Sequence, residues 1–155
     1  VEEKNIWYQN FYPEDIGNYK VDCLYHNSPN RIRYQIVTPK QIKGYDLVIC
    51  CADNLDVRRL VYRLGFQSEC KGKWLDLRAQ GRNGALISYL TDPKFSDAFL
   101  TGPEGSFSCQ GESFTDGKDT NNIHWTHVAI AGIGAQWVQR WFNGEEVKDK
   151  MVINI

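Results

Sequence analysis

The stretch Leu47-Val48-Ile49-Cys50-Cys51-Ala52-Asp53-Asn54 decides the fold of this 155-residue chain. Its first six residues are apolar on both faces of an extended strand. Such a run is typical of an interior strand of a parallel sheet, and we expect the strand to span residues 45–52. Asp53 then stands where the strand ends. Residues 54–64 carry leucine and valine at helical spacing, so the pattern predicts a strand, a turn and a helix.

Working outward, the flanking segments predict a single α/β domain over residues 1–155. We expect a Rossmann-like, mostly parallel sheet with flanking helices and an antiparallel hairpin extension. Before the central strand, Pro13 opens a helix entry. The other expected elements are a helix over 18–26, a half-exposed strand over 31–37, strands over 73–80 and 85–90 joined by a turn at 81–84, an irregular crossover loop over 91–122, a helix over 124–142 and a final strand over 151–155.

Composition narrows the function classes. The chain has 18 basic and 19 acidic residues and a pI near 6.3, so no global charge draws it to nucleic acid or to an anionic membrane surface. Its longest apolar runs are far below membrane-spanning length. Its five cysteines are an odd number and two are adjacent, unlike the disulfide framework of a small secreted domain. This pattern predicts a cytoplasmic protein.

Asp53 and Lys20 are the residues expected to carry chemistry. In an open α/β sheet, ligands bind beyond the carboxyl ends of the strands, where Asp53 is expected. One carboxylate suffices for Mg²⁺ on a triphosphate, because the ion keeps several waters and phosphate oxygens as ligands. Lys20 supplies a point charge for phosphates, and Gly17 lets the backbone approach them. The alternatives are structural: a helix cap at Asp53-Asn54 and a solvated surface lysine at Lys20.

Three motifs together resemble those of the ThiF/MoeB/ubiquitin-activating family of adenylyltransferases. They are Asn5-Ile6-Trp7-Tyr8-Gln9, Asp15-Ile16-Gly17-Asn18-Tyr19-Lys20, and Ala52-Asp53-Asn54 with Arg58. The resemblance covers most of the chain and implies a partial adenylation domain. It implies that Asp53 bears Mg²⁺ and that Lys20 faces the phosphates of ATP. The residues implied to surround ATP are Asn5, Gln9, Lys20, Asp53, Asn54 and Arg58.

The resemblance also implies partners and a third reactive residue. The substrate would be the C-terminal carboxylate of a ubiquitin-like or sulfur-carrier protein, and the protein would form a homodimer or heterodimer. Cys109 lies in the 91–122 segment, where thioester- or persulfide-forming members of the family carry a reactive cysteine. A plain free thiol is the alternative. No structural zinc is expected, because the family's Cys-x-x-Cys pairs are absent.

Two differences from the family keep other functions open. Tyr8 stands where the family has an arginine that contacts the triphosphate, and a phenol does not replace that charge. The glycine-rich loop and first strand that the family places ahead of the first motif do not precede Asn5, so we expect them upstream in a longer polypeptide or in a partner. A non-catalytic scaffold is therefore the competing hypothesis. A nicotinamide-dependent dehydrogenase is weaker, because its Gly-x-Gly-x-x-Gly fingerprint is missing.

Overall fold

The structure, a computed structural model, describes residues 1–7, 9–23, 38, 42, 44–64, 72–101 and 123–155. Backbone contacts divide the chain into two compact units. Unit 1 comprises Val1–Ile36 and Glu112–Ile123, and unit 2 comprises Val37–Gly111 and His124–Ile155. Each unit has its own elements and its own buried residues.

The described part of unit 1 consists of short helical turns. Two 3₁₀ helices, η1 (Glu3–Trp7) and η2 (Pro13–Asp15), precede the short α-helix α1 (Lys20–Cys23). The helix entry predicted at Pro13 is confirmed, and there the Asp15 carboxylate accepts a hydrogen bond from the backbone N–H of Tyr12 at 2.9 Å. The helix predicted over 18–26 is present from Lys20 to Cys23. The strand predicted over 31–37 lies outside the described residues.

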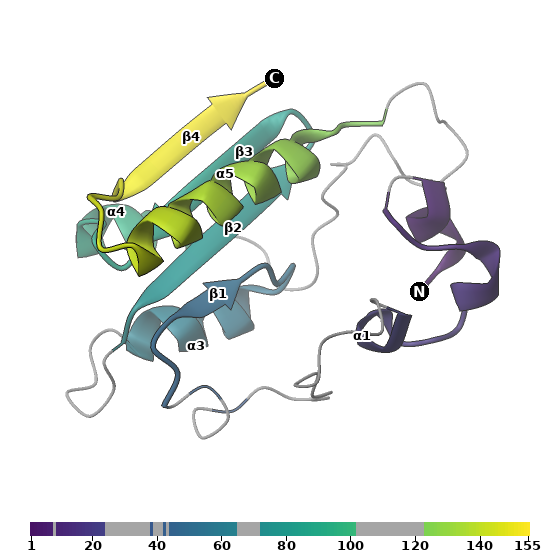
Figure 1. The fold of residues 1–155 in the computed structure, drawn as a ribbon, viewed down its shortest axis with the longest axis horizontal. Coiled ribbons are helices and arrows are strands. Elements are labelled where there is room, and N and C mark those ends of the chain that lie inside the picture. The colour runs from purple at the N-terminus through teal and green to yellow at the C-terminus, as the bar shows by residue number, and fades with distance from the viewer. Residues whose placement is uncertain (8, 24–37, 39–41, 43, 65–71, 102–122) are drawn as a thin grey trace. The chain divides into compact units, whose positions relative to one another are not determined.

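Unit 2 is built on a four-stranded sheet in the order β1-β2-β3-β4 (Figure 1). The strands are β1 (Val48–Cys50), β2 (Trp74–Gln80), β3 (Asn83–Ser88) and β4 (Lys150–Asn154). β1 runs parallel to β2, and the other two pairs are antiparallel. The α/β class is therefore confirmed. The expectation of a mostly parallel sheet is wrong for the described strands, which form a mixed sheet because β3 is antiparallel to both β2 and β4.

Two helices cover the two faces of this sheet. α3 (Leu55–Leu64) packs its Val61 and Tyr62 against one face, and α5 (Thr126–Phe142) packs Ile130 and Trp137 against the other (Figure 1). Successive residues of a strand alternate between faces, so Trp74 belongs to the first core and its neighbour to the second. The helices predicted over 54–64 and 124–142 are both confirmed.

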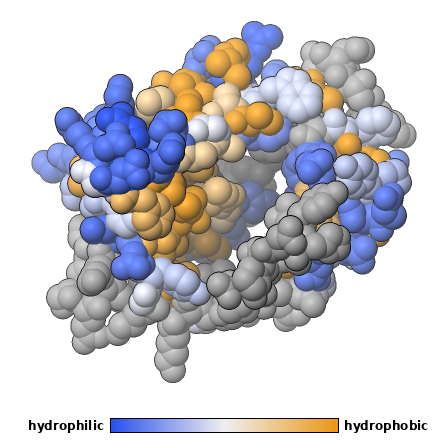
Figure 2. All heavy atoms as spheres, in the orientation of Figure 1, coloured by the Kyte–Doolittle hydropathy of each residue, from blue (hydrophilic) through white to orange (hydrophobic). Residues whose placement is uncertain are grey.

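β1 is shorter than the strand predicted over 45–52, and it is more exposed. Cys50 is buried under α3, whereas Ile49, on the α5 side, is 48% exposed because α5 packs over β2 and β3. Figure 2 shows hydrophobic surface, in orange, over the region where α5 and β1 lie. Among the described residues β1 pairs with one strand, β2.

The hairpin between β2 and β3 is confirmed, but its turn is tighter than predicted. Gln80 pairs with Asn83, so Gly81 and Arg82 alone form the turn, and Asn83-Gly84 belongs to β3. Gly81 has a φ of +55°, which a glycine adopts at little cost at the first position of a two-residue hairpin loop. The turn therefore depends on Gly81, the first glycine of the segment, and not on Asn83-Gly84.

The predicted irregular segment 91–122 begins with a helix. α4 (Pro93–Ala98) follows Asp92, whose side chain accepts a hydrogen bond from the backbone N–H of Lys94 at 2.8 Å. Aspartate at the N-cap with proline at the first helical position is a standard helix start, so the expectation of a loop was wrong there. Residues 102–122 lie outside the described part. None of the described helices is both long and apolar enough to span a membrane.

Candidate functional site

Asp53 lies at the carboxyl end of β1, as predicted from the apolar run before it. The residue is exposed and lies two positions before the first residue of α3. The adjacent Asn54 caps this helix, because its Oδ1 accepts hydrogen bonds from the backbone N–H groups of Asp56 and Val57 at 2.8 and 3.3 Å. The helix-cap interpretation therefore applies to Asn54. It leaves the Asp53 carboxylate at the end of a parallel strand, where α/β proteins bind ligands.

Arg58 is buried beneath this strand end. Only 8% of the residue is exposed, and its guanidinium forms an ion pair with Asp76, which is fully buried in β2. The same guanidinium donates hydrogen bonds to the carbonyl oxygens of Ala52 and Leu77. Arg58 thereby fixes the chain just before Asp53 to the neighbouring strand. Burial, followed by the nearby Arg78, lowers the pKa of Arg58.

Two more side chains donate hydrogen bonds to the Asp76 carboxylate on the side of the sheet that α3 covers. Arg78 donates from its Nε to Asp76 at 2.8 Å, and the Tyr62 hydroxyl donates to the same carboxylate at 2.6 Å. Arg78 also donates to the Phe99 carbonyl oxygen at 2.6 Å and lies over the Phe99 ring. Burial raises the pKa of Tyr62, so its phenol stays a donor to the carboxylate. We call Arg58, Tyr62, Asp76 and Arg78 the Asp76 cluster.

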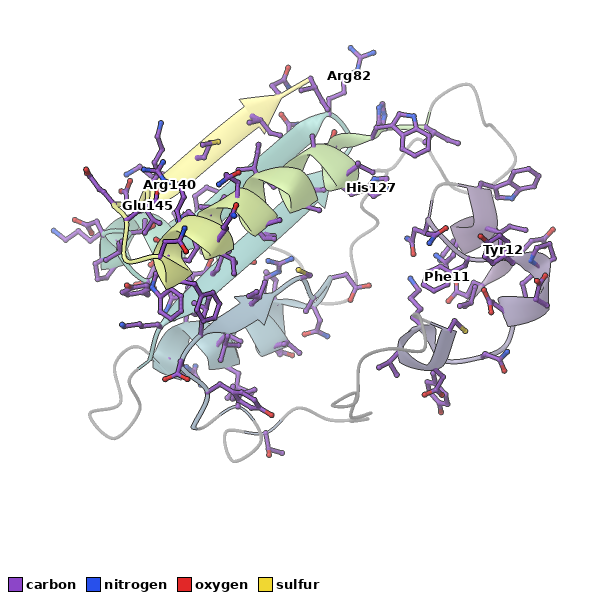
Figure 3. The ribbon with its side chains drawn as sticks, viewed as in Figure 1. Phe11, Tyr12, Arg82, His127, Arg140 and Glu145 are labelled. Atoms are coloured by element: carbon purple, nitrogen blue, oxygen red, sulfur yellow. The ribbon has the colours of Figure 1, made fainter. Side chains whose placement is uncertain are left out.

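Lys20 and Gln9 meet in unit 1. The Lys20 ammonium donates a hydrogen bond to the Gln9 side-chain oxygen at 3.1 Å and lies 5.9 Å from the centre of the Phe11 ring. Figure 3 labels this ring and the neighbouring Tyr12. Asn5 is only 3% exposed, and its Oδ1 accepts a hydrogen bond from the Glu2 backbone N–H at 2.9 Å. Of the three ATP-site residues predicted in unit 1, two therefore contact each other and Asn5 holds a turn.

The cysteine that is predicted to react is not among the cysteines that the structure describes. Cys109, the predicted nucleophile, lies outside the described residues. Cys50 is a buried core thiol whose pKa is raised by burial, whereas Cys51 is exposed. In the described part of the chain, His, Cys, Asp and Glu do not gather in groups of three that would hold a metal ion. A lone Asp53 fits Mg²⁺ held mainly by phosphates and water, and does not fit a metal cage built from protein ligands.

Comparisons with known proteins assign neither a family nor a function to this chain. No protein-family model matches the chain, no curated protein matches it, and no solved structure matches it. The resemblance to the adenylyltransferase family, with the ATP, Mg²⁺ and carrier-protein partners it implies, stays a prediction from the sequence motifs.

The Asp76 cluster is the feature that sequence reasoning missed. Its signal in the sequence is weak but present: in Trp74-Leu75-Asp76-Leu77-Arg78 the two charges alternate with apolar residues. Such alternation usually places charges on an exposed face. Here that face lies under α3, so both charged side chains are turned toward the buried Arg58 and Tyr62.

Proposed function

We propose that this chain is the nucleotide-handling part of an adenylyltransferase. The enzyme would activate the C-terminal carboxylate of a ubiquitin-like or sulfur-carrier protein with ATP. A carboxylate oxygen attacks the α-phosphorus of ATP, the bond from that phosphorus to the pyrophosphate oxygen breaks, and an acyl adenylate and pyrophosphate form. Such chemistry requires alignment and charge neutralisation more than covalent groups from the protein.

The observation that carries the proposal is the position of Asp53. An exposed carboxylate follows the carboxyl end of a strand that is parallel to its neighbour, and a ten-residue helix starts two residues after it. The hydrogen bonds of Arg58 to Ala52 and Leu77 support the backbone beside it. A fixed carboxylate at that place suits a Mg²⁺ ion, which would neutralise phosphate charge and orient the leaving pyrophosphate.

The residues assigned to the nucleotide differ in how well their surroundings suit the role. Asp53 and Lys20 are exposed, so each is accessible to a ligand. Arg58 and Asn5 are buried and bonded within the protein. We therefore assign magnesium to Asp53, and the phosphate contact of Lys20 stays a prediction from the sequence motifs. Arg58 serves the reaction by positioning the backbone before Asp53.

The internal ion pair of Arg58 also supports a second function. The charge of Arg58 is compensated by the buried Asp76, and Tyr8 replaces the other arginine that the resemblance expects to face the triphosphate. Loss of two cationic contacts favours a non-catalytic scaffold that binds a carrier protein or an active partner subunit. This alternative predicts no nucleotide binding by the chain.

The test is ATP–pyrophosphate exchange, measured with the full chain, Mg²⁺ and a panel of ubiquitin-like and sulfur-carrier proteins. We expect carrier-dependent exchange, and we expect Asp53→Asn to lower its rate about a hundredfold or more, because it removes the charge that holds the metal ion. Asp56→Asn is the matched control. That carboxylate is 82% exposed, lies three residues further along and pairs with Arg59, so exchange should change less than about twofold.

Equilibrium titration with ATP and Mg²⁺ separates the two functions. Saturable nucleotide binding that Asp53→Asn weakens supports the adenylyltransferase. If the wild-type chain binds a carrier protein yet shows neither nucleotide binding nor exchange, the scaffold is the correct function. Equal exchange rates in wild type and Asp53→Asn would contradict the assignment of Asp53.

A further inference from the structure

β4 is the longer of the two outer strands of the described sheet (Figure 1). It has five residues, against three in β1. All five pair with β3 in an unbroken antiparallel register, from Asn154 at one end to Lys150 at the other. The strand is therefore regular along its whole length, without a bulge that would turn its outer edge away from another strand.

The hydrogen bonds to β3 show which backbone groups of β4 face outward. The N–H of Ser88 donates to the carbonyl oxygen of Asp149 at 2.8 Å, and the N–H of Ile155 donates to that of Arg82 at 3.0 Å. In an antiparallel pair, every second residue bonds to the neighbouring strand. The odd-numbered residues from Asp149 to Ile155 therefore bond to β3. The even-numbered residues of β4 turn their N–H and C=O groups away from β3: Lys150, Val152 and Asn154.

The side chains along the outer edge of β4 do little to keep another strand away. Val152, the middle residue of the strand, is 63% exposed. Valine favours pleated sheets, and an apolar edge without a central charge or proline is a place where sheets join. Lys150 is the one charged residue of β4. Its ammonium is held at the start of the strand, 3.3 Å from the Asp149 carboxylate and 4.4 Å from the centroid of the Phe95 ring.

The outer edge of β4 is complementary to itself. When two copies run antiparallel about a twofold axis at Val152, each Val152 lies opposite the other, and Lys150 lies opposite Asn154 of the second copy. Every residue in these pairs has its N–H and C=O groups pointing outward, so the two residues of each pair exchange hydrogen bonds. An amide lies opposite each ammonium, so no like charges face each other. A surface that matches itself in this way is what a twofold dimer requires.

We propose that β4 pairs antiparallel with β4 of a second copy of this chain, centred on Val152, so that the two four-stranded sheets become one continuous sheet. A contact between five-residue strands buries less than the roughly 1,200 Å² at which stable complexes begin. The dimer is therefore reversible, with a dissociation constant of roughly 10–1,000 µM. Asp53 follows β1, at the other edge of the sheet, so dimerisation and the proposed adenylation chemistry are tested separately.

Two measurements on the full chain test the pairing. Sedimentation velocity between about 10 µM and about 1 mM should show a monomer that becomes a dimer as the concentration rises. Amide hydrogen exchange, followed by NMR at both concentrations, then locates the contact. The outward amides of Val152 and Asn154 should exchange roughly fivefold more slowly at the high concentration, whereas those of Met151 and Ile153, which already bond to β3, should change less than about twofold. A chain that stays monomeric, or a dimer without this slowing, would overturn the proposal.

Substitutions at the centre of the edge complete the test. Val152→Lys sets two lysines directly opposite each other at the twofold axis, so the dimer should weaken about tenfold or more. Val152→Thr keeps a β-branched side chain and the backbone N–H, and the dissociation constant should stay within about threefold. Val128→Lys puts the same charge on α5, where Val128 is 54% exposed, and should change it less than about twofold. Equal dissociation constants for Val152→Lys and Val128→Lys would refute pairing through β4.

Discussion

At the scale of single residues, the buried Asp76 joins three other side chains of unit 2: Arg58, Tyr62 and Arg78. Its carboxylate has no solvent exposure and meets two guanidinium groups and one phenol. A buried charge is costly unless it is paired and hydrogen-bonded, and here the pairing involves both α3 and β2. The cluster therefore links the helix after Asp53 to the strand beside it.

Asp76→Asn should destabilise the protein by about 3–5 kcal/mol, because it leaves two buried or half-buried guanidinium groups without their counter-charge. Urea unfolding followed by circular dichroism measures the change. Asp97→Asn, which removes an exposed carboxylate, should change the free energy of unfolding by less than about 0.5 kcal/mol. Equal effects of the two substitutions would show that the Asp76 cluster contributes little to stability.

The placement of Asp53 was predictable from the sequence, and that of Arg58 was not. An apolar run followed by aspartate and a helical pattern identifies the end of a strand from local spacing alone. The pairing of Arg58 with Asp76 depends on β1 and β2 being neighbours, with Asp76 turned toward α3. No local spacing shows which strand lies beside which, so a residue assigned to the ligand can form an internal ion pair.

At the scale of elements, α5 shows how small residues let a helix approach a sheet. A Cβ atom added at Gly134 would lie 2.5 and 3.0 Å from the two terminal methyl carbons of Leu77 in β2. At Gly132 an added Cβ meets nothing within 4 Å. Gly134 therefore lets α5 lie close to Leu77 of β2.

Comparing the stabilities of Gly132→Ala and Gly134→Ala should separate the effect of helix propensity from the effect of packing. Gly132→Ala should stabilise the protein by about 0.5–1 kcal/mol, because alanine loses less conformational entropy than glycine in a helix. Gly134→Ala gains the same propensity but forces Leu77 to move, so it should be about 1–3 kcal/mol less stable than Gly132→Ala. Thermal unfolding of both variants measures the difference. Equal stability would mean that Leu77 adapts without cost.

Most described elements of unit 2 follow from sequence periodicity, but their pairing does not. The α3, β2, β3, α5 and β4 segments all lie close to their predicted ranges. The antiparallel pairing of β2 with β3 was predicted from the hairpin, whereas the antiparallel pairing of β3 with β4 was not, because no local pattern shows which strand lies beside the final one. The start of α4 was missed although Asp92-Pro93 is a standard helix start, because its surroundings show little helical periodicity.

At the scale of the whole molecule, stability rests on two cores on opposite faces of one sheet. One contains Tyr62, Trp74 and Ile87 under α3, and the other contains Leu75, Leu86 and Trp137 under α5. The described part of unit 1 buries fewer apolar side chains, with Phe11 as its buried hydrophobic residue. The free energy of unfolding of the chain should therefore report mainly on unit 2.

The pH dependence of global stability should reveal the buried phenol of Tyr62. Its raised pKa means that the folded state keeps a proton that the unfolded state releases near pH 10. The stabilisation is complete below that pH and is lost as the pH rises toward the folded-state pKa. In urea unfolding between pH 8 and pH 11, wild type should therefore lose more stability than Tyr62→Phe. A difference in stability between wild type and Tyr62→Phe that stays constant with pH would contradict this prediction. Tyr45→Phe, at an exposed tyrosine, serves as the control.

The distribution of the five indole rings gives this protein its own optical reporters. Trp74 and Trp137 are each 5% exposed, one in each core, whereas Trp125 is 55% exposed. Trp7, 47% exposed, is the sole tryptophan in the sequence of unit 1. Rings in dry surroundings emit at shorter wavelengths than rings in water. When unit 2 unfolds, the emission of its buried Trp74 and Trp137 should therefore shift to longer wavelength.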